Sequence, residues 1–110
     1  PGRLYHCHNA AITVVRAARE EIAAMGRTLA GLLEEASGPV HIAAPQGGFS
    51  AFDHPAGGPM PDPEAPGIFL EAFRSALRRD IPLTVFPGHI NDPEFADLLV
   101  GILQDLGRRP

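Results

Sequence analysis

The chain has a single cysteine, Cys7, and no apolar run near the ~20 residues that a membrane-spanning helix needs. One cysteine excludes an internal disulfide framework and fits a reducing compartment, so we expect a cytoplasmic protein without a membrane partner. The basic residues are scattered, and the formal net charge is -4. A nucleic-acid partner is not expected, because binding to a phosphate backbone needs a clustered basic surface.

The chain also lacks an initial methionine, since it opens with Pro1-Gly2-Arg3. This start suggests a C-terminal piece of a longer protein, so we expect residues 1–110 to be the C-terminal part of one domain, with an N-terminal domain absent. The 45% hydrophobic and 20% charged residues are ordinary for a globular protein and disfavour disorder. A domain of this length buries a core only if its elements close on one another.

Apolar residues recur every three or four positions from Thr13 to about Ala36, which predicts a first helix. Glycine weakens a helix interior, so Gly26 beside the apolar stripe indicates close packing against a neighbour. Short apolar runs predict strands at 40–44 and 83–86. Periodic runs predict a second helix that ends near Arg79 and a third that begins at Pro93 and buries Phe95, Leu99, Ile102 and Leu106.

The order helix, strand, helix, strand, helix predicts an α/β fold, a Rossmann-like parallel sheet layer with flanking helices. Two strands alone do not make a stable sheet, so we expect further strands from a missing segment or another subunit. Ligands of open parallel sheets bind beyond the carboxyl ends of the strands. We therefore expect any site in the loops that follow residues 44 and 86.

The first of these loops, from Pro45 to Pro61, is rich in glycine and proline and has no periodicity. Structureless loops of this length are often functional. Gly47, Gly48 and Ser50 follow the strand, where successive backbone N–H groups can form an anion-binding nest beside the serine hydroxyl. The loop lacks the lysine of a Walker motif and the spacing of a dinucleotide fingerprint.

The sequence Asp-Pro-Glu occurs twice, at Asp62–Glu64 and Asp92–Glu94, each time before a predicted helix. Asp at the N-cap, Pro at the first helical position and Glu in the first turn form a good helix start. The second copy is preceded by His89 and Asn91. A histidine at the end of a strand can act as acid or base near neutrality. The alternative is a histidine bonded to loop carbonyls.

The candidate catalytic residues are therefore His89 as acid or base and Asp53 or Asp62 as its carboxylate partner. The chain order of Ser50, Asp53 and His89 resembles that of a serine hydrolase. That interpretation fails because a nucleophile elbow needs a second glycine and a position tight against the strand.

Two other groups are candidates for binding. Arg16 would lie in the first turn of the first helix, where the helix dipole disfavours a cation, which indicates an acidic loop or an anionic ligand as its partner. His6, Cys7 and His8 alternate on an extended segment. No matching Cys/His pair recurs elsewhere in the sequence, so no metal site is predicted.

Three segments carry a family resemblance: His8-Asn9 followed by Val15-Arg16; Pro45-x-x-Gly48-x-Ser50-x-x-Asp53 with Gly57-Gly58-Pro59 and Asp62-Pro63-Glu64-Ala65; and His89-Ile90-Asn91-Asp92-Pro93-Glu94-Phe95-Ala96. Together they resemble the C-terminal domain of the Tm-one-like ATP-binding proteins, a family with many uncharacterised bacterial members. The chain departs from the family at Ala10, where relatives often have proline.

The resemblance implies a two-domain α/β protein that forms dimers or larger assemblies. It also implies binding of ATP or another nucleotide, mainly through the N-terminal domain absent from this chain. Three interpretations stay open: a binding protein, an unrecognised metabolic enzyme, or a domain whose loops form a subunit interface. In the first, a cleft for a small molecule or nucleotide includes Gly47, Gly48, Ser50, Asp53, Asp62, His89, Asn91 and Arg16.

Overall fold

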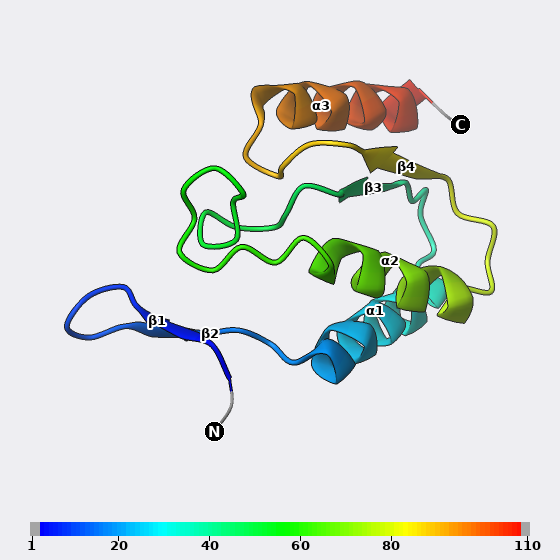
Figure 1. The fold of residues 1–110 in the computed structure, drawn as a ribbon. Coiled ribbons are helices and arrows are strands. Elements are labelled where there is room, and N and C mark those ends of the chain that lie inside the picture. The colour runs from blue at the N-terminus through cyan, green and yellow to red at the C-terminus, as the bar shows by residue number, and fades with distance from the viewer. Residues whose placement is uncertain (1–2, 109–110) are drawn as a thin grey trace.

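The fold comes from a computed structural model that describes residues 3–108. Its elements are, in order, β1 (Tyr5–Cys7), β2 (Thr13–Val15), α1 (Arg19–Glu34), β3 (Ile42–Pro45), α2 (Ala65–Ala76), β4 (Leu83–Phe86) and α3 (Pro93–Arg108). The parallel pair β3 and β4 lies between α3 on one side and α1 and α2 on the other, while the β1–β2 hairpin projects away (Figure 1). The chain is thus an α/β protein with a parallel sheet flanked by helices, as predicted.

The parallel sheet is short, with Ile42 opposite Leu83 and Pro45 opposite Phe86. The strand predicted at 40–44 begins two residues later, because the ladder starts where the N–H of Ile42 donates to Pro82 O at 2.9 Å. All four residues of β4 remain half-buried. This incomplete burial is the expected state of a two-stranded sheet.

The core lies between α1, α2 and the sheet, and its buried members are Ala30, Leu70 and Phe73. Close approach of the two helices explains Gly26: a Cβ at this position would lie 2.5 Å from the backbone O of Phe69. The predicted close packing at Gly26 is confirmed. Any side chain there would force the helices apart.

The C-terminal end of α1 is held by the segment that follows α2. The Glu34 carboxylate accepts hydrogen bonds from the backbone N–H groups of Arg78 and Arg79. The Arg79 guanidinium donates to Leu33 O at 3.0 Å and to Ala36 O at 2.7 Å. Leu33 O also accepts the backbone N–H of Ala36 at 3.2 Å, so Arg79 adds a second donor there and supplies one to Ala36 O.

The prediction of a first helix from Thr13 was wrong at its start. Thr13–Val15 instead pairs antiparallel with Tyr5–Cys7, and the helix begins at Arg19. All three residues of this segment are β-branched and favour an extended backbone, and pairing with a partner strand outweighed the helical periodicity. Ala18 has no side-chain acceptor, and the first turn is held by Glu21, which accepts the Ala18 N–H at 2.8 Å. Arg16 therefore lies before the helix, not in its first turn.

The second helix runs only from Ala65 to Ala76, so its predicted end near Arg79 was wrong by three residues. Its N-cap position is Glu64, and Asp62 is not a cap. Pro66 lies in the first turn, which suits the helix start because proline has no N–H to satisfy there.

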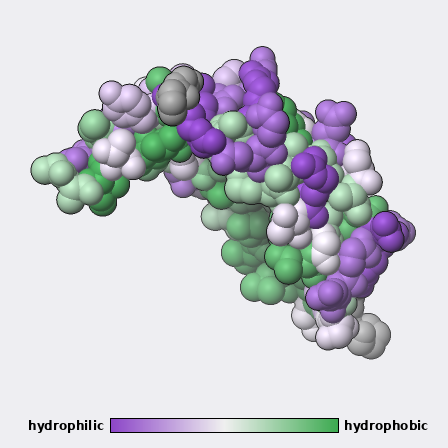
Figure 2. All heavy atoms as spheres, turned by 90° about the horizontal axis from the view of Figure 1, so that it is seen from below, coloured by the Kyte–Doolittle hydropathy of each residue, from purple (hydrophilic) through white to green (hydrophobic). Residues whose placement is uncertain are grey.

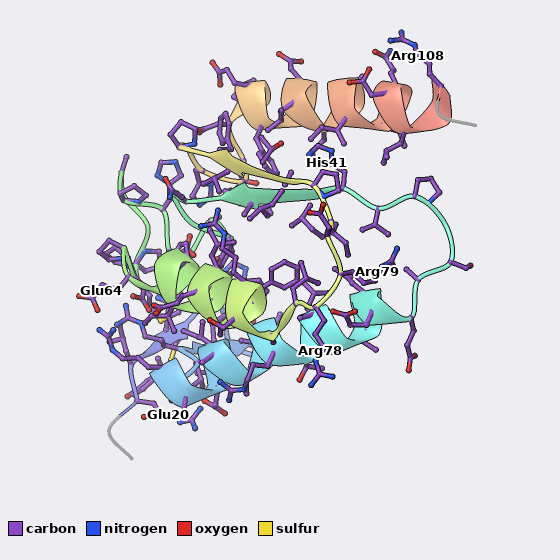
Figure 3. The ribbon with its side chains drawn as sticks, turned by 90° about the vertical axis from the view of Figure 1, so that its right-hand side faces the viewer. Glu20, His41, Glu64, Arg78, Arg79 and Arg108 are labelled. Carbon is purple, nitrogen blue, oxygen red and sulfur yellow. The ribbon has the colours of Figure 1, made fainter. Side chains whose placement is uncertain are left out.

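The third helix spans the predicted residues but is less buried than predicted. Only Phe95 is buried, at 4% exposure, whereas Leu99 is 43% exposed and Ile102 and Leu106 are half-buried. A sheet of two strands offers α3 a narrow surface, which explains the difference. Figure 3 shows α3 and its terminal Arg108 across the sheet from Glu20 and Glu64. Among the helices of residues 3–108, none combines the length and apolarity needed to cross a bilayer.

Candidate functional site

The loops after β3 and β4 run side by side beyond the ends of the strands. Gly47 donates its backbone N–H to Gly88 O at 2.7 Å, and Ile90 donates to Gly48 O at 3.1 Å. A Cβ on Gly47 would lie 2.6 Å from the carbonyl carbon of Gly88, so only glycine permits this approach. The parallel topology thus brings the two glycine-rich loops into direct contact.

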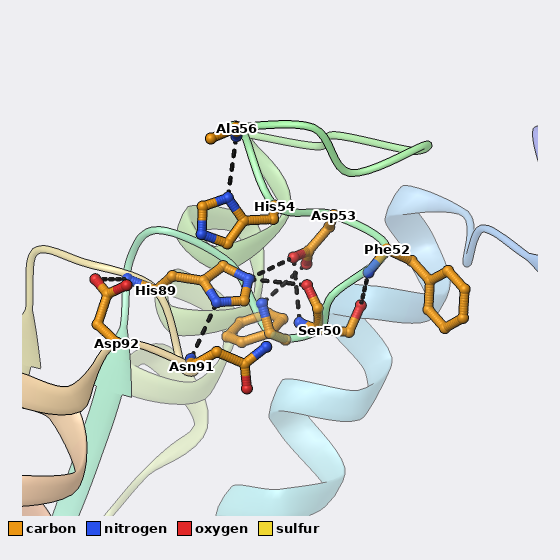
Figure 4. A network of polar contacts seen from close by, with 9 residues as sticks. Ser50, Phe52, Asp53, His54, Ala56, His89, Asn91 and Asp92 are labelled. Atoms are coloured by element: carbon orange, nitrogen blue, oxygen red, sulfur yellow. Dashed lines mark hydrogen bonds and ion pairs between the residues drawn. The ribbon is translucent and has the colours of Figure 1, made fainter.

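The Asp53 carboxylate is the centre of the polar network at these loops (Figure 4). Its Oδ2 accepts the Phe49 N–H at 2.9 Å, and its Oδ1 accepts the Ser50 N–H at 3.1 Å. The ring of His89 is also 3.1 Å away, measured from Nε2 to Asp53 Oδ1. The backbone N–H groups suited to an external anion therefore hold an internal carboxylate.

His89 is buried, with 2% of its surface exposed, and both of its ring nitrogens have partners. Nδ1 accepts the backbone N–H of Asn91 at 3.0 Å, so the ring proton lies on Nε2. Nε2 then donates to Ser50 O at 2.8 Å and to Asp53 Oδ1. The geometry is that of a histidine bonded to loop groups, and it ties the second loop to the first.

Two neighbours complete the network around His89. Asp92 directly precedes α3, and its Oδ2 accepts the backbone N–H of His89 at 2.9 Å. The carboxylate therefore turns back into the loop. The ring of His54 lies 4.4 Å from that of His89 and is tilted 41° to it, and its Nδ1 accepts the N–H of Ala56 at 3.0 Å. Every polar contact in this network is made within the two loops.

A pocket of about 400 Å³ lies beside this network, between the β1–β2 hairpin, α1, α2 and the first loop. Its walls are mainly apolar and include Val15, Ile22, Met25, Phe49, Phe52 and Phe69. Seen from below, the molecule is arched, and hydrophobic side chains gather on the inner side of the arch (Figure 2). Such a pocket has the size and lining of a site for a small molecule.

The polar part of the pocket wall consists of Arg16, Ser50, Asp53 and Asp62. Arg16 donates from Nη2 to Pro61 O at 2.8 Å, and its Nε lies 3.7 Å from Asp62 Oδ2. The sequence indicated an acidic loop or an anionic ligand as the partner of Arg16, and the structure shows the acidic loop, through Asp62. The long Nε to Oδ2 distance indicates a weak ion pair.

Four of the predicted binding residues therefore line one pocket: Arg16, Ser50, Asp53 and Asp62. The other four, Gly47, Gly48, His89 and Asn91, lie in the loops around the network and are not part of that wall. Sequence reasoning missed the contribution of the hairpin, whose segment 14–17 forms one wall. The signal that could have revealed the hairpin is the β-branched run Thr13-Val14-Val15, which follows shortly after Tyr5-His6-Cys7.

The hairpin reaches the first loop through its histidines. The rings of His6 and His8 lie 5.8 and 5.5 Å from the ring of Phe52. The exposed Cys7 Sγ instead accepts a hydrogen bond from the Thr13 hydroxyl at 3.9 Å. Alternation along β1 thus separates the thiol from the two imidazoles, which contact an apolar ring.

Residues 1–107 match the family model described as the C-terminal domain of an uncharacterised protein family, UPF0261. A UPF0261 protein of Rhizobium meliloti (strain 1021) is 37% identical over 107 residues, which cover 96% of this chain and 27% of that protein. A UPF0261 protein of Brucella melitensis is 37% identical over 100 residues, 91% of this chain and 24% of that protein.

The ToMV resistance protein Tm-1(GCR237) of Solanum lycopersicum is 34% identical over 100 residues, which cover 89% of this chain and 13% of that protein. The chain thus spans about a quarter of the length of the bacterial relatives. The resemblance carried by the three sequence segments is confirmed. With a family model that matches nearly all of its residues, the chain belongs to the UPF0261 family and corresponds to its C-terminal domain.

Proposed function

We propose that this domain binds a small molecule with an apolar body in the pocket between the hairpin, α1, α2 and the first loop. The observation that carries the proposal is the pocket itself: about 400 Å³, walled by apolar and aromatic side chains, with few polar groups. Ligand sites typically have this size and composition, in which apolar walls supply affinity and a few polar groups fix orientation.

The network of Asp53 and His89 has a positioning role in this proposal. It holds the segment 49–53, from which Phe49, Ser50 and Phe52 reach the pocket wall. A general acid or base needs a nitrogen directed at the substrate, and both nitrogens of His89 are directed at the loops. Binding is therefore better supported than acid–base catalysis by His89.

A nucleotide is the second candidate ligand, because the rings of Phe49, Phe52 and Phe69 offer faces on which a base can stack. The pocket wall has one cation, Arg16, and two carboxylates, Asp53 and Asp62. A triphosphate would be repelled by this balance of charge. We therefore assign ATP, as the resemblance implies, to the N-terminal part of the longer protein.

The rest of the protein and further copies of it are the proposed macromolecular partners. The half-buried sheet and the exposed Leu99 of α3 leave apolar surface that a longer chain or a second subunit would cover. Assembly into dimers or larger oligomers would be compatible with these surfaces. The pocket proposal does not depend on that assembly, because every wall residue named above belongs to this domain.

A screen for ligands that stabilise the complete protein tests the proposal. We expect uncharged apolar compounds of pocket size to raise its melting temperature. Met25→Trp should abolish the shift, because Met25 is 50% exposed and lines the pocket, so that the indole fills the space without disturbing the core. Leu32→Trp on the same helix, 64% exposed, is the control. Equal shifts in both variants would refute binding in this pocket.

A further inference from the structure

A second hollow, of about 250 Å³, adjoins the apolar pocket at the start of α1. Three arginines are among the residues that line it: Arg3, Arg16 and Arg19. Arg16, Ala17 and Asp62 belong to the walls of both cavities, so the two cavities adjoin along these residues. The arginines therefore lie at the edge of the apolar pocket, next to any molecule that fills it.

The side chains that line the hollow carry an excess of positive charge, three guanidiniums against the single carboxylate of Asp62. This position is electrostatically unfavourable for cations, because the N-terminus of the 16-residue helix α1 carries a positive partial charge. Two carboxylates outside the hollow balance this excess: Glu21 pairs with Arg3 at 2.6 Å, and Glu64 pairs with Arg19.

These ion pairs leave the arginines able to bind a further anion. The side chains are 48% exposed for Arg3 and 64% exposed for Arg19, and exposed pairs contribute little net free energy. Each guanidinium has five N–H donors in a planar fork, more than one carboxylate can use. Arg16 donates to Pro61 O and lines both cavities.

Building on the proposed pocket, we propose that the ligand is amphipathic, with an apolar body in the pocket and a carboxylate or phosphate group bound by Arg3, Arg16 and Arg19. Planar bidentate contacts to guanidinium suit both kinds of anion. The charge of the first pocket alone disfavours an anion there, so the anionic group belongs in the second hollow and not beside Asp53. The two ends of one ligand molecule thus occupy separate cavities.

Four probes of matched chain length test this on the complete protein by calorimetry: octanol, octanoate, octyl phosphate and inorganic phosphate. Octanol reports the apolar pocket alone. We expect octanoate or octyl phosphate to bind about tenfold or more tightly than octanol, the gain of a charge-assisted contact. The ratio between the two octyl anions separates a carboxylate from a phosphate ligand. Inorganic phosphate should bind weakly, because it lacks the apolar body.

The double variant Arg3→Gln/Arg19→Gln should lower the affinity for the octyl anions to that for octanol, while the affinity for octanol stays unchanged. Arg108→Gln is the matched control, since Arg108 lies at the end of α3, remote from this hollow (Figure 3). Its affinities should equal those of the unaltered protein.

The outcomes separate the two proposals. If octanol and the octyl anions bind equally well, or if the double variant weakens all three equally, the anion subsite is refuted and the apolar pocket stands. If no octyl compound binds, the pocket proposal fails, and the subsite falls with it. Binding of octyl anions that Met25→Trp leaves intact would also overturn the subsite, because the head group would then be held away from this pocket.

Discussion

Nε2 of His89 lies 3.1 Å from Oδ1 of Asp53, and this contact joins the loop after β4 to the loop after β3 across 36 residues of sequence. The same carboxylate accepts the N–H groups of Phe49 and Ser50, which leaves the pair fully engaged with its own loops. The pair therefore fixes the shape of the pocket wall.

Replacing Asp53 with Asn should loosen the first loop. The amide keeps one acceptor oxygen but turns an NH₂ group toward a backbone donor, so one of the two N–H groups loses its hydrogen bond at a cost of about 0.5–1.5 kcal/mol. Hydrogen exchange at the amides of Phe49 and Ser50 should accelerate accordingly. Asp97→Asn, an exposed change on α3, should leave these rates unaltered. Unchanged protection of both amides would contradict the structural role of Asp53.

Replacing His89 with Ala should destabilise the domain by about 3 kcal/mol, because a buried ring is removed and its partners lose their bonds. Urea unfolding followed in the complete protein measures the effect, with the exposed His8→Ala as the reference. A catalytic His89 predicts a different result: lost turnover with stability unchanged. That result would return the acid–base interpretation to first place.

Two glycines of α1 should respond in opposite directions to the same substitution. Gly26→Ala places a methyl group against the backbone of α2 and should destabilise the domain by about 1–3 kcal/mol. Gly31 has nothing within 4 Å of its would-be Cβ, so Gly31→Ala should stabilise the domain by about 0.5–1 kcal/mol through helix propensity. Urea denaturation midpoints measure both. Destabilisation by the two changes alike would mean that the helix packing is not as described.

Stability at acidic pH should depend on Glu21. The backbone N–H of Ala18, and secondarily the Arg3 guanidinium, lower the pKa of Glu21 below its ordinary 4.5. A lowered folded-state pKa means that the stabilising contribution is fully present above the unfolded value and is lost as the pH falls through the folded value.

Glu21→Gln should therefore flatten the loss of stability on acidification below about pH 5, measured as melting temperature against pH. Glu20→Gln, the neighbouring residue in the same helical turn, is the control and should retain the slope of the unaltered protein. A slope that Glu21→Gln leaves unchanged would show that the carboxylate does not hold the helix start.

The limits of prediction from sequence are physical. Long periodic runs identified α2 and α3, and the apolar run Leu83–Phe86 identified β4 without error, because these patterns are local. The hairpin was missed because three-residue strands have too few positions to show alternation, and the pairing of Tyr5–Cys7 with Thr13–Val15 is decided by contact. The burial of Leu99 was overestimated because sequence periodicity does not reveal the width of the sheet beneath a helix.

The candidate site also has parts that could be predicted from the sequence and parts that could not. Parallel topology correctly indicated that the loops after β3 and β4 would meet, and that Asp53, Ser50 and His89 would come together there. No sequence pattern indicated that the Asp53 carboxylate would occupy the amides of its own loop. Nor could the sequence show that Arg3 and Arg19 would converge with Arg16, since their convergence depends on the hairpin.

The chain's two methionines, Met25 and Met60, both line the apolar pocket and provide the most direct test of the account. The complete protein would be labelled at methionine methyl groups and titrated with octanol and octanoate, with the two NMR signals assigned by Met25→Leu and Met60→Leu. We predict that both signals shift together and saturate at one ligand concentration. Signals that stay fixed while calorimetry records binding would contradict the account, because the ligand would then lie elsewhere.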